Sequence, residues 1–156
     1  MNQIILASHG GLAAGAKDTL EMVLGDVSNV HVVSLARDDK EPITNKVDAL
    51  IATFNADDTV YVLTDMLGSS VNNSMVELSK NGTKFTVVSG FNIPLALTLA
   101  MSPAPVKGAE LAALINEART GLTNPQRTGS RPPRLPPRGQ GVPSQLRSRQ
   151  DRPRTS

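Results

Sequence analysis

The chain has 156 residues, 39% of them hydrophobic, which is enough for one domain with a buried core. It has no cysteine and only two histidines, so disulfides and thiolate metal sites are excluded and a metal centre is not expected. The sequence shows neither a charged leader nor an apolar run of the roughly 18 residues that a membrane span requires, and we expect a cytoplasmic protein.

The net charge of +2 averages two unlike parts of the chain. Residues 1–120 hold 8 basic and 13 acidic residues, a net charge of −5, whereas residues 121–156 hold 8 arginines and one aspartate, a net charge of +7. The second part carries seven of the eleven prolines and few aliphatic residues, so we predict a domain over 1–120 and a disordered Arg/Pro-rich tail over 121–156. No aromatic residues are interleaved with the arginines, which favours a vector-derived or out-of-frame extension over a nucleic-acid-binding tail.

The first predicted element is a strand. Its aliphatic run over 4–7 is too short for a helix and is typical of a strand buried on both faces of a parallel sheet, with His9 at the carboxyl end. Apolar residues then recur at helical spacing over 12–24, and Gly25 is predicted to cap that helix. His9 therefore lies at the edge of the sheet where ligands bind in α/β folds.

The rest of the domain repeats this alternation. Further strands are predicted over 30–35, 59–64 and 85–88. Helices are expected from Pro42 to about Phe54, from the Gly68–Ser70 loop to about Asn81, from Pro94 to about Met101, and around 111–118. The pattern predicts an α/β fold with an open, mainly parallel four-stranded sheet and helices on both faces.

If the first, third and fourth strands are neighbours, their carboxyl ends bring His9 and Asp65 together. A neutral imidazole is a good nucleophile toward phosphorus when a carboxylate fixes its tautomer, and Asp65 is the candidate for that carboxylate. Gly10 and Gly11 permit close approach, and Ser70 and nearby N–H groups could hold phosphate oxygens. These residues suit phosphohistidine chemistry.

Other interpretations of the same residues stay open. His9 could serve as a local hydrogen-bonding residue in a glycine loop, and Asp65 as a helix cap or turn residue. His31 lies within a strand and is expected to be structural. A hydrolase with Ser8 or Ser70 as nucleophile lacks the Gly-x-Ser-x-Gly elbow, and no Walker A or dinucleotide-binding pattern is present.

Three segments resemble one known family in the same order along the chain. Residues 4–10 and 22–25 resemble the opening of mannose-type IIA components of the bacterial phosphoenolpyruvate-dependent sugar phosphotransferase system. Residues 62–73, Val-Leu-Thr-Asp-Met-Leu-Gly-Ser-Ser-Val-Asn-Asn, resemble the family's Leu-Thr-Asp-Leu-Phe-Gly-Gly-Ser-Pro-x-Asn segment. Residues 89–95, Ser-Gly-Phe-Asn-Ile-Pro-Leu, resemble its Thr-Gly-x-Asn-Leu-Pro-Met segment.

The resemblance implies a homodimer without a cofactor, in which His9 accepts a phosphoryl group from the phosphocarrier HPr and passes it to a IIB component of a sugar permease. It further implies that Asp65 orients the ring, that Ser70 lies near the phosphate, and that the protein reaches the membrane only through the permease. Ser69 and Val71 depart from the family's second glycine and proline. The resemblance fades near residue 121, so the fifth strand that some members exchange across the dimer is not expected.

Three alternative functions remain. One is a phosphocarrier that serves dihydroxyacetone kinase, whose loop also carries Asp, Gly, Ser, Asn and Met in this order. A second is a regulatory module of a transcription activator, and a third is a non-catalytic, flavodoxin-like ligand-binding domain. The sequence indicates neither the sugar nor the IIB partner.

Overall fold

The computed structural model describes residues 1–128 and contains a sheet of four parallel strands. The strands are β1 (Asn2–His9), β2 (Val30–Leu35), β3 (Thr59–Thr64) and β4 (Thr86–Ser89), in the spatial order β2-β1-β3-β4. In the register, Ile4 of β1 lies opposite Val30 on one side and Tyr61 on the other. The first, third and fourth strands are therefore neighbours, which is the condition on which the predicted site depended.

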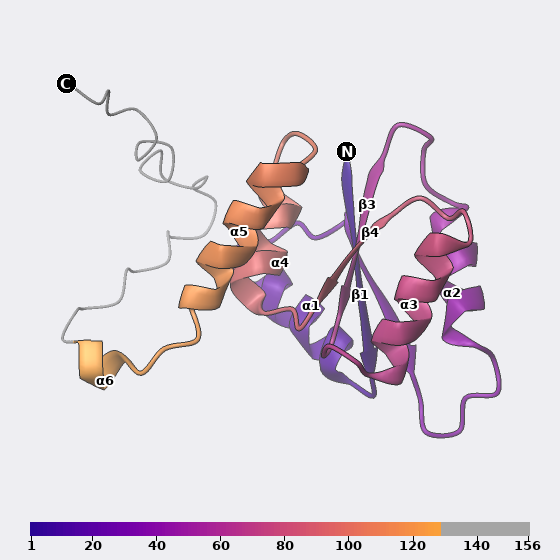
Figure 1. Ribbon diagram of the computed structural model, residues 1–156, viewed down its shortest axis with the longest axis horizontal. Helices are drawn as coiled ribbons and strands as arrows, with labels where there is room; N and C mark the ends of the chain where they lie inside the picture. The colour runs from indigo at the N-terminus through magenta and orange to yellow at the C-terminus, as the bar shows by residue number, and fades with distance from the viewer. Residues whose placement is uncertain (129–156) are drawn as a thin grey trace. The chain divides into compact units, whose positions relative to one another are not determined.

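Helices cover both faces of the sheet, as predicted (Figure 1). The helices are α1 (Leu12–Leu24), α2 (Ile43–Ile51), α3 (Ser70–Lys80), α4 (Ile93–Met101) and α5 (Gly108–Thr120). In Figure 1, α2 and α3 lie on one side of the strands, and α1, α4 and α5 lie on the other. The connections between successive parallel strands therefore run through helices, as the α/β pattern requires.

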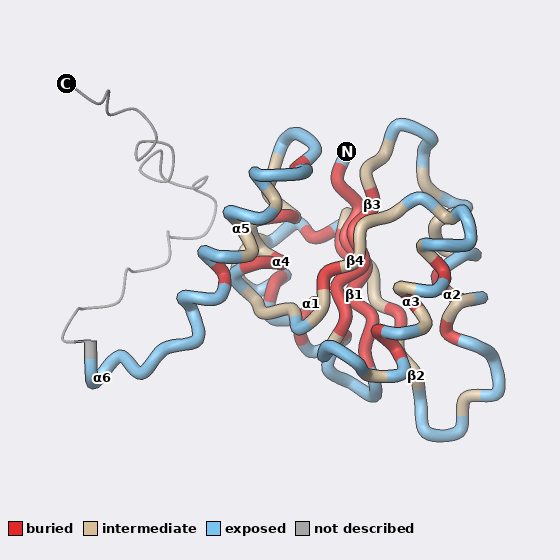
Figure 2. The backbone as a smooth tube through the Cα atoms, viewed as in Figure 1, coloured by how far each residue is buried: buried red, intermediate tan, exposed pale blue. Residues whose placement is uncertain are grey.

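The sheet is buried on both faces because successive side chains of a strand point in opposite directions (Figure 2). In β1, Ile4 and Leu6 pack in the core under α1, α4 and α5, whereas Ile5 packs in the core under α2 and α3. All three are fully buried. This two-sided burial explains why β1 reads as an unbroken apolar run rather than as an alternating one.

The boundaries of the predicted elements agree with the structure to within about three residues. Gly25 ends α1 at φ 85°, a conformation that glycine adopts without strain, as predicted. Pro42 precedes the first turn of α2, and this helix ends at Ile51, so Phe54 is not part of it. The N–H of Phe54 donates to the carbonyl of Ile51 in a tight turn, and the ring of Phe54 still packs in the core beneath α2.

Residues Met1–Thr123 form one compact unit, and α6 (Pro125–Thr128) belongs to a second one. The predicted disorder of the tail falls mainly on residues 129–156, which lie outside the described residues. Within residues 1–128, no helix is long and apolar enough to cross a bilayer. The same part of the chain holds no cluster of three metal-binding side chains.

Candidate active site

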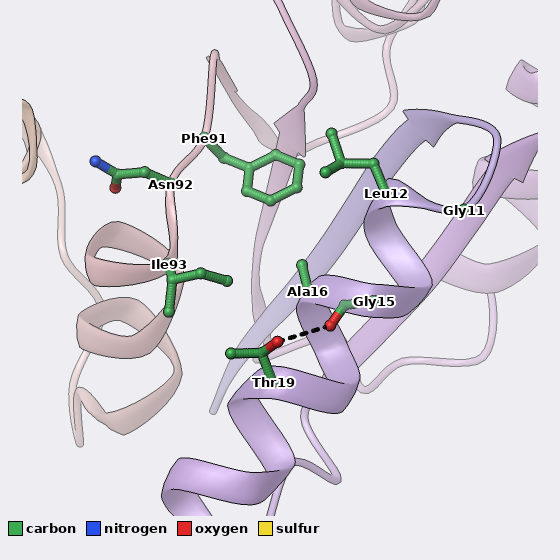
Figure 3. A pocket seen from close by; sticks show the side chains of 8 residues that line it. All are labelled: Gly11, Leu12, Gly15, Ala16, Thr19, Phe91, Asn92 and Ile93. Atoms are coloured by element: carbon green, nitrogen blue, oxygen red, sulfur yellow. Dashed lines mark hydrogen bonds between the residues drawn. The ribbon is translucent and has the colours of Figure 1, made fainter. Parts of the chain in front are cut away.

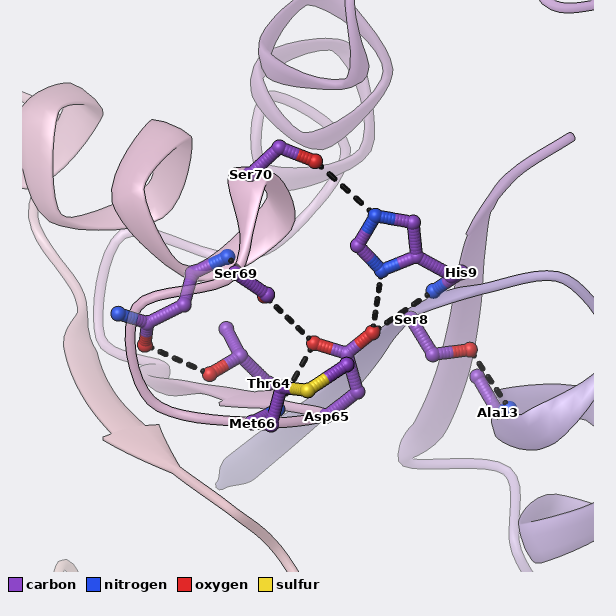
Figure 4. Close-up of polar contacts among 9 residues, drawn as sticks. Ser8, His9, Ala13, Thr64, Asp65, Met66, Ser69 and Ser70 are labelled. Carbon is purple, nitrogen blue, oxygen red and sulfur yellow. Dashed lines mark hydrogen bonds and ion pairs between the residues drawn. The ribbon is translucent and has the colours of Figure 1, made fainter. Parts of the chain in front are cut away.

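The candidate site lies where β1 and β3 end, at the carboxyl edge of the sheet (Figure 4). His9 is the last residue of β1, Asp65 follows β3 directly, and Ser70 is the first residue of α3. Because β1 and β3 are paired in parallel with Ala7 opposite Thr64, the two strands deliver His9 and Asp65 to the same edge. The topology thus brings His9 next to Asp65, 56 positions later in the chain, and next to Ser70, 61 positions later.

Both ring nitrogens of His9 have a partner. Nδ1 lies 2.6 Å from Oδ2 of Asp65, and Nε2 lies 3.0 Å from Oγ of Ser70. The backbone N–H of His9 donates to the same Oδ2 at 3.0 Å. The His9 side chain is 43% exposed, whereas that of Asp65 is 6% exposed. The imidazole is therefore fixed in orientation and yet open to a reactant from solvent.

The carboxylate of Asp65 accepts four hydrogen bonds, two at each oxygen. Oδ2 accepts the two from His9, and Oδ1 accepts the N–H of Met66 and the hydroxyl of Ser69, both at 2.8 Å. Burial disfavours the charged form, but the hydrogen bonds from His9, Ser69 and Met66 outweigh it and lower the pKa of Asp65 to about 2. Asp65 is therefore ionised at neutral pH.

This hydrogen-bond pattern assigns the tautomer of His9. An ionised carboxylate only accepts, so the neutral ring carries its proton on Nδ1, facing Asp65. Nε2 then has the free lone pair, and the hydroxyl of Ser70 can donate to it. Among the two nitrogens, Nε2 is thus the one able to act as a nucleophile.

The two glycines after His9 differ in what their backbone does. Gly10 has φ 56°, in the left-handed region, and its N–H donates to the carbonyl of Leu35 at 3.0 Å. That N–H is therefore already used in a hydrogen bond between β1 and β2. Gly11 precedes the first turn of α1, and no acceptor for its N–H lies among residues 1–128.

Ser8 and His31 have structural roles, as predicted for His31. Ser8 is fully buried, and its hydroxyl accepts the N–H of Ala13 at 2.9 Å at the start of α1. It is not exposed at the site, which excludes it as a hydrolase nucleophile. His31 lies on β2, half-buried, with Nε2 2.8 Å from Oε1 of Gln3 and its ring against Phe54.

Sequence reasoning missed the polar network that supports the loop after β3. Asn72 is buried at the start of α3, and its Oδ1 accepts the hydroxyl of Thr64 at 2.8 Å and that of Ser89. Ser69 contacts Asp65 from the same loop, although the sequence marked it only as a departure from a family motif. The available signal was a serine immediately before a helical pattern, which is typical of an N-cap.

A groove of about 630 Å³ lies beside the site, between α1 and the segment that joins β4 to α4 (Figure 3). In Figure 3 the side chains of Leu12 and Phe91 face each other across it. Its walls are mainly apolar and are formed by Gly11, Leu12, Gly15, Ala16, Thr19, Phe91, Asn92 and Ile93. The groove begins at Gly11, two residues from His9.

Comparison with known proteins decides the family. The model of the EIIA-man family, described as PTS system fructose IIA component, matches residues 3–118. The chain belongs to this family. The match includes His9, Asp65 and Ser70 and all three motifs on which the resemblance was based.

Individual relatives agree with the mannose-type assignment. The sorbose-specific EIIA component of Lacticaseibacillus casei is 26% identical over 102 residues, covering 64% of this chain and 72% of the relative. The mannose-specific EIIAB component of Escherichia coli K12 is 27% identical over 100 residues, and the match spans 64% of this chain but only 31% of that longer protein. A solved IIA protein associated with the fucose utilization operon of Streptococcus pneumoniae has a TM-score of 0.70 and 30% identity, covering 83% of this chain and 96% of that chain.

These matches confirm that the chain is a mannose-type IIA component of the sugar phosphotransferase system. IIA components are phosphotransfer proteins that work with a phosphocarrier and a IIB partner. Of the alternatives, the comparisons favour neither a phosphocarrier for dihydroxyacetone kinase nor a non-catalytic ligand-binding domain.

Proposed function

We propose that this IIA component accepts a phosphoryl group from the phosphocarrier HPr on Nε2 of His9 and passes it to a IIB component of a sugar permease. The observation that supports this most is the hydrogen bond between Nδ1 of His9 and the ionised Asp65, at 2.6 Å, which leaves the lone pair on Nε2 of a side chain that is 43% exposed. The family supports the reaction class, and the hydrogen bonds of His9 support Nε2 as the acceptor atom.

The transfer step follows from this geometry. The Nε2 lone pair attacks the phosphorus of the donor phosphohistidine, a new P–N bond forms, and the bond to the donor ring breaks with its electron pair returning to that ring. The His9 ring gains positive charge as the bond forms, and the carboxylate of Asp65, against Nδ1–H, stabilises that charge. Because the donor is already an activated phosphoramidate, the step requires neither a metal nor a nucleotide.

Ser70 and Gly11 are the proposed phosphate-binding residues. The hydroxyl of Ser70, 3.0 Å from Nε2, can turn its proton from the nitrogen to a phosphoryl oxygen once the lone pair is used. The N–H of Gly11 lies at the start of α1, where a helix N-terminus favours an anion. Gly10 allows the chain to turn after β1 but supplies no hydrogen-bond donor to the phosphate, since its N–H donates to the carbonyl of Leu35.

The exposed apolar residues next to the site suit a protein partner rather than a small substrate. Leu12, Met66 and Leu67 are 55%, 58% and 83% exposed, and they flank the catalytic residues in sequence. Apolar patches beside a reactive group are typical of protein–protein contact sites.

We further propose that the protein is a homodimer, on the basis of the family resemblance. Sedimentation velocity would test this by measuring the mass of the particle.

The test is intact-mass analysis after incubation with phosphoenolpyruvate, enzyme I and HPr. We expect an acid-labile gain of about 80 Da, the mass of one phosphoryl group in covalent transfer, and no gain in the His9→Ala variant. The matched control is His31→Ala, which removes the other histidine and should keep the gain. Uptake by the His9→Ala variant, or none by the wild-type protein, would refute the proposal.

A further inference from the structure

Ser69 makes two hydrogen bonds through one hydroxyl, and they join the catalytic carboxylate to a helix. Its Oγ donates to Oδ1 of Asp65 at 2.8 Å and accepts the backbone N–H of Asn72 at 3.1 Å. Ser69 is the N-cap of α3, with φ −67° and ψ 161°. Gly68, just before it, has φ 80°, which lets the loop turn sharply enough to place both contacts.

At this position the chain departs from the motif that it resembles. The motif carries a second glycine where the chain has Ser69, so the hydroxyl is an addition. The chain also lacks the motif's proline and has Val71 instead.

The contact acts on the terminal torsion of the Asp65 side chain. The terminal torsion of a carboxylate side chain is broad, so its plane is set by its hydrogen-bond donors. Oδ2 is held by His9, and of the two donors at Oδ1 the N–H of Met66 comes from the adjacent residue. Ser69 is therefore the donor that ties the carboxylate to α3.

The same helix carries the group on the other side of the imidazole. Ser70 follows Ser69 directly, and its Oγ lies 3.0 Å from Nε2 of His9. Ser69 thus links the two partners of the ring, because it hydrogen-bonds to Asp65, the partner of Nδ1, and directly precedes Ser70, the partner of Nε2.

We propose that Ser69 is a positioning residue, whose hydroxyl fixes the Asp65 carboxylate so that His9 keeps its proton on Nδ1 and its lone pair on Nε2. The inference rests on the proposed function of His9 as the phosphoryl acceptor. The low pKa of Asp65 agrees with it, since the Ser69 hydroxyl is among the hydrogen bonds that lower the value.

Three variants separate this role from helix capping. Ser69→Gly removes the donor, and glycine is itself among the favoured N-cap residues, so the start of α3 should be little affected. Ser69→Thr keeps both the donor and the cap. Asn92→Gly is the control for loss of an N-cap side chain, because Asn92 accepts the N–H of Leu95 at the start of α4 and makes no hydrogen bond to Asp65. It also loses the hydrogen bond from Nδ2 of Asn92 to the carbonyl of Ala118, which lies outside the site.

The first readout is the tautomer of His9 in the unphosphorylated protein, measured by ¹⁵N-histidine NMR at a pH where the ring is neutral. We expect the wild-type, Ser69→Thr and Asn92→Gly proteins to hold the proton on Nδ1, and Ser69→Gly to show a mixture of both tautomers. The second readout is the rate of phosphoryl transfer from HPr, which should fall about tenfold in Ser69→Gly, the size expected for one lost hydrogen bond to a charged group, and recover in Ser69→Thr.

The outcomes distinguish this inference from the function on which it rests. A wild-type tautomer or a wild-type transfer rate in Ser69→Gly would overturn the positioning role, as would failure of Ser69→Thr to restore both. A wild-type protein that takes up no phosphoryl group would refute the proposed function instead. The tautomer measurement still decides the Ser69–Asp65–His9 linkage in that event, because it involves no transfer.

Discussion

At the scale of single residues, the site is an imidazole held between a carboxylate and a hydroxyl. Asp65 accepts four hydrogen bonds with a side chain that is 6% exposed, so its orientation leaves little freedom to the ring that it contacts. A carboxylate in this position selects the tautomer and stabilises the cation that forms on transfer. Replacing Asp65 should therefore slow phosphoryl transfer strongly while the protein still folds.

The Asp65→Asn variant tests this role. An amide is nearly the same size but uncharged, so it cannot stabilise the charged ring, and it can hold the wrong tautomer. We expect phosphoryl transfer from HPr to slow by roughly 100-fold or more, with an unchanged far-UV circular dichroism spectrum. A rate within a few-fold of wild type would mean that Asp65 only caps the loop.

Asp65 should also make stability depend on pH in acid. Its folded-state pKa of about 2 lies below its ordinary value of 3.8, so the stability it adds is complete above about pH 5 and is lost as the pH falls toward 2. The shift corresponds to about 2 kcal/mol at neutral pH. In urea titrations at neutral pH, the free energy of unfolding of the wild-type protein should exceed that of Asp65→Asn by about this amount. The difference between the two proteins should nearly vanish near pH 2. A difference that stays constant with pH would contradict the assigned ionisation.

At the scale of elements, the hydroxyl of Tyr61 ties the sheet to the connection between α4 and α5. Tyr61 is fully buried on β3; its hydroxyl donates to the carbonyl of Val106 and accepts the N–H of the same residue, both at 2.8 Å. Val106 is 2% exposed, so water does not replace this partner easily. The contact lies at the core and makes no hydrogen bond with His9 or Asp65.

Tyr61→Phe should therefore lower stability without affecting transfer. Removing the hydroxyl leaves the buried N–H and carbonyl of Val106 without their partner, at a cost of about 1–3 kcal/mol. Urea or thermal unfolding measures the loss, and the HPr transfer rate of the folded variant should equal that of wild type. A stable variant, or one with slowed transfer, would show that the contact has a different role.

The sequence predicted strands, helices and the edge on which the site lies, because these depend on local patterns. The strands β1 and β3 are short, mainly apolar runs, and a polar residue marks the carboxyl end of each, so the sequence alone could pair His9 with Asp65. The partner of the Gly10 N–H could not be predicted. It is the carbonyl of Leu35, and that contact depends on the register of β1 against β2, which no local pattern encodes.

The role of Ser69 was beyond sequence reasoning for a similar reason. A serine before a helix predicts a cap, and the structure contains that cap. The second contact, to Asp65, depends on the turn made by Gly68 and on where β3 ends. In a loop, unlike in a helix, a spacing of four residues does not predict contact, so the sequence could not pair Ser69 with Asp65.

At the scale of the whole molecule, the charge is unevenly distributed along the chain. Residues 1–120 carry a net charge of −5 and residues 121–156 a net charge of +7. An acidic domain attracts a partner with a basic docking surface, and such steering is weakened by salt. The basic segment opposes this attraction when it is present.

Salt should therefore slow transfer from HPr, and more steeply without the basic segment. We expect the second-order rate constant to fall about tenfold between roughly 0.05 and 0.5 M salt in a chain that ends at Thr123, the last residue of the compact unit, and less in the full chain. Stopped-flow transfer assays measure both slopes. Equal slopes, or a rate that rises with salt, would contradict electrostatic steering by the domain.

The central claim, that Nε2 of His9 carries the phosphoryl group, is tested most directly by NMR of the ¹⁵N-histidine-labelled protein after phosphorylation by enzyme I and HPr. The chain has only two histidines, so His31 is an internal reference. The account predicts ³¹P–¹⁵N coupling at Nε2 of His9, with Nδ1 still protonated against Asp65 and the signals of His31 unchanged. Coupling at Nδ1 of His9, or at His31, would contradict it.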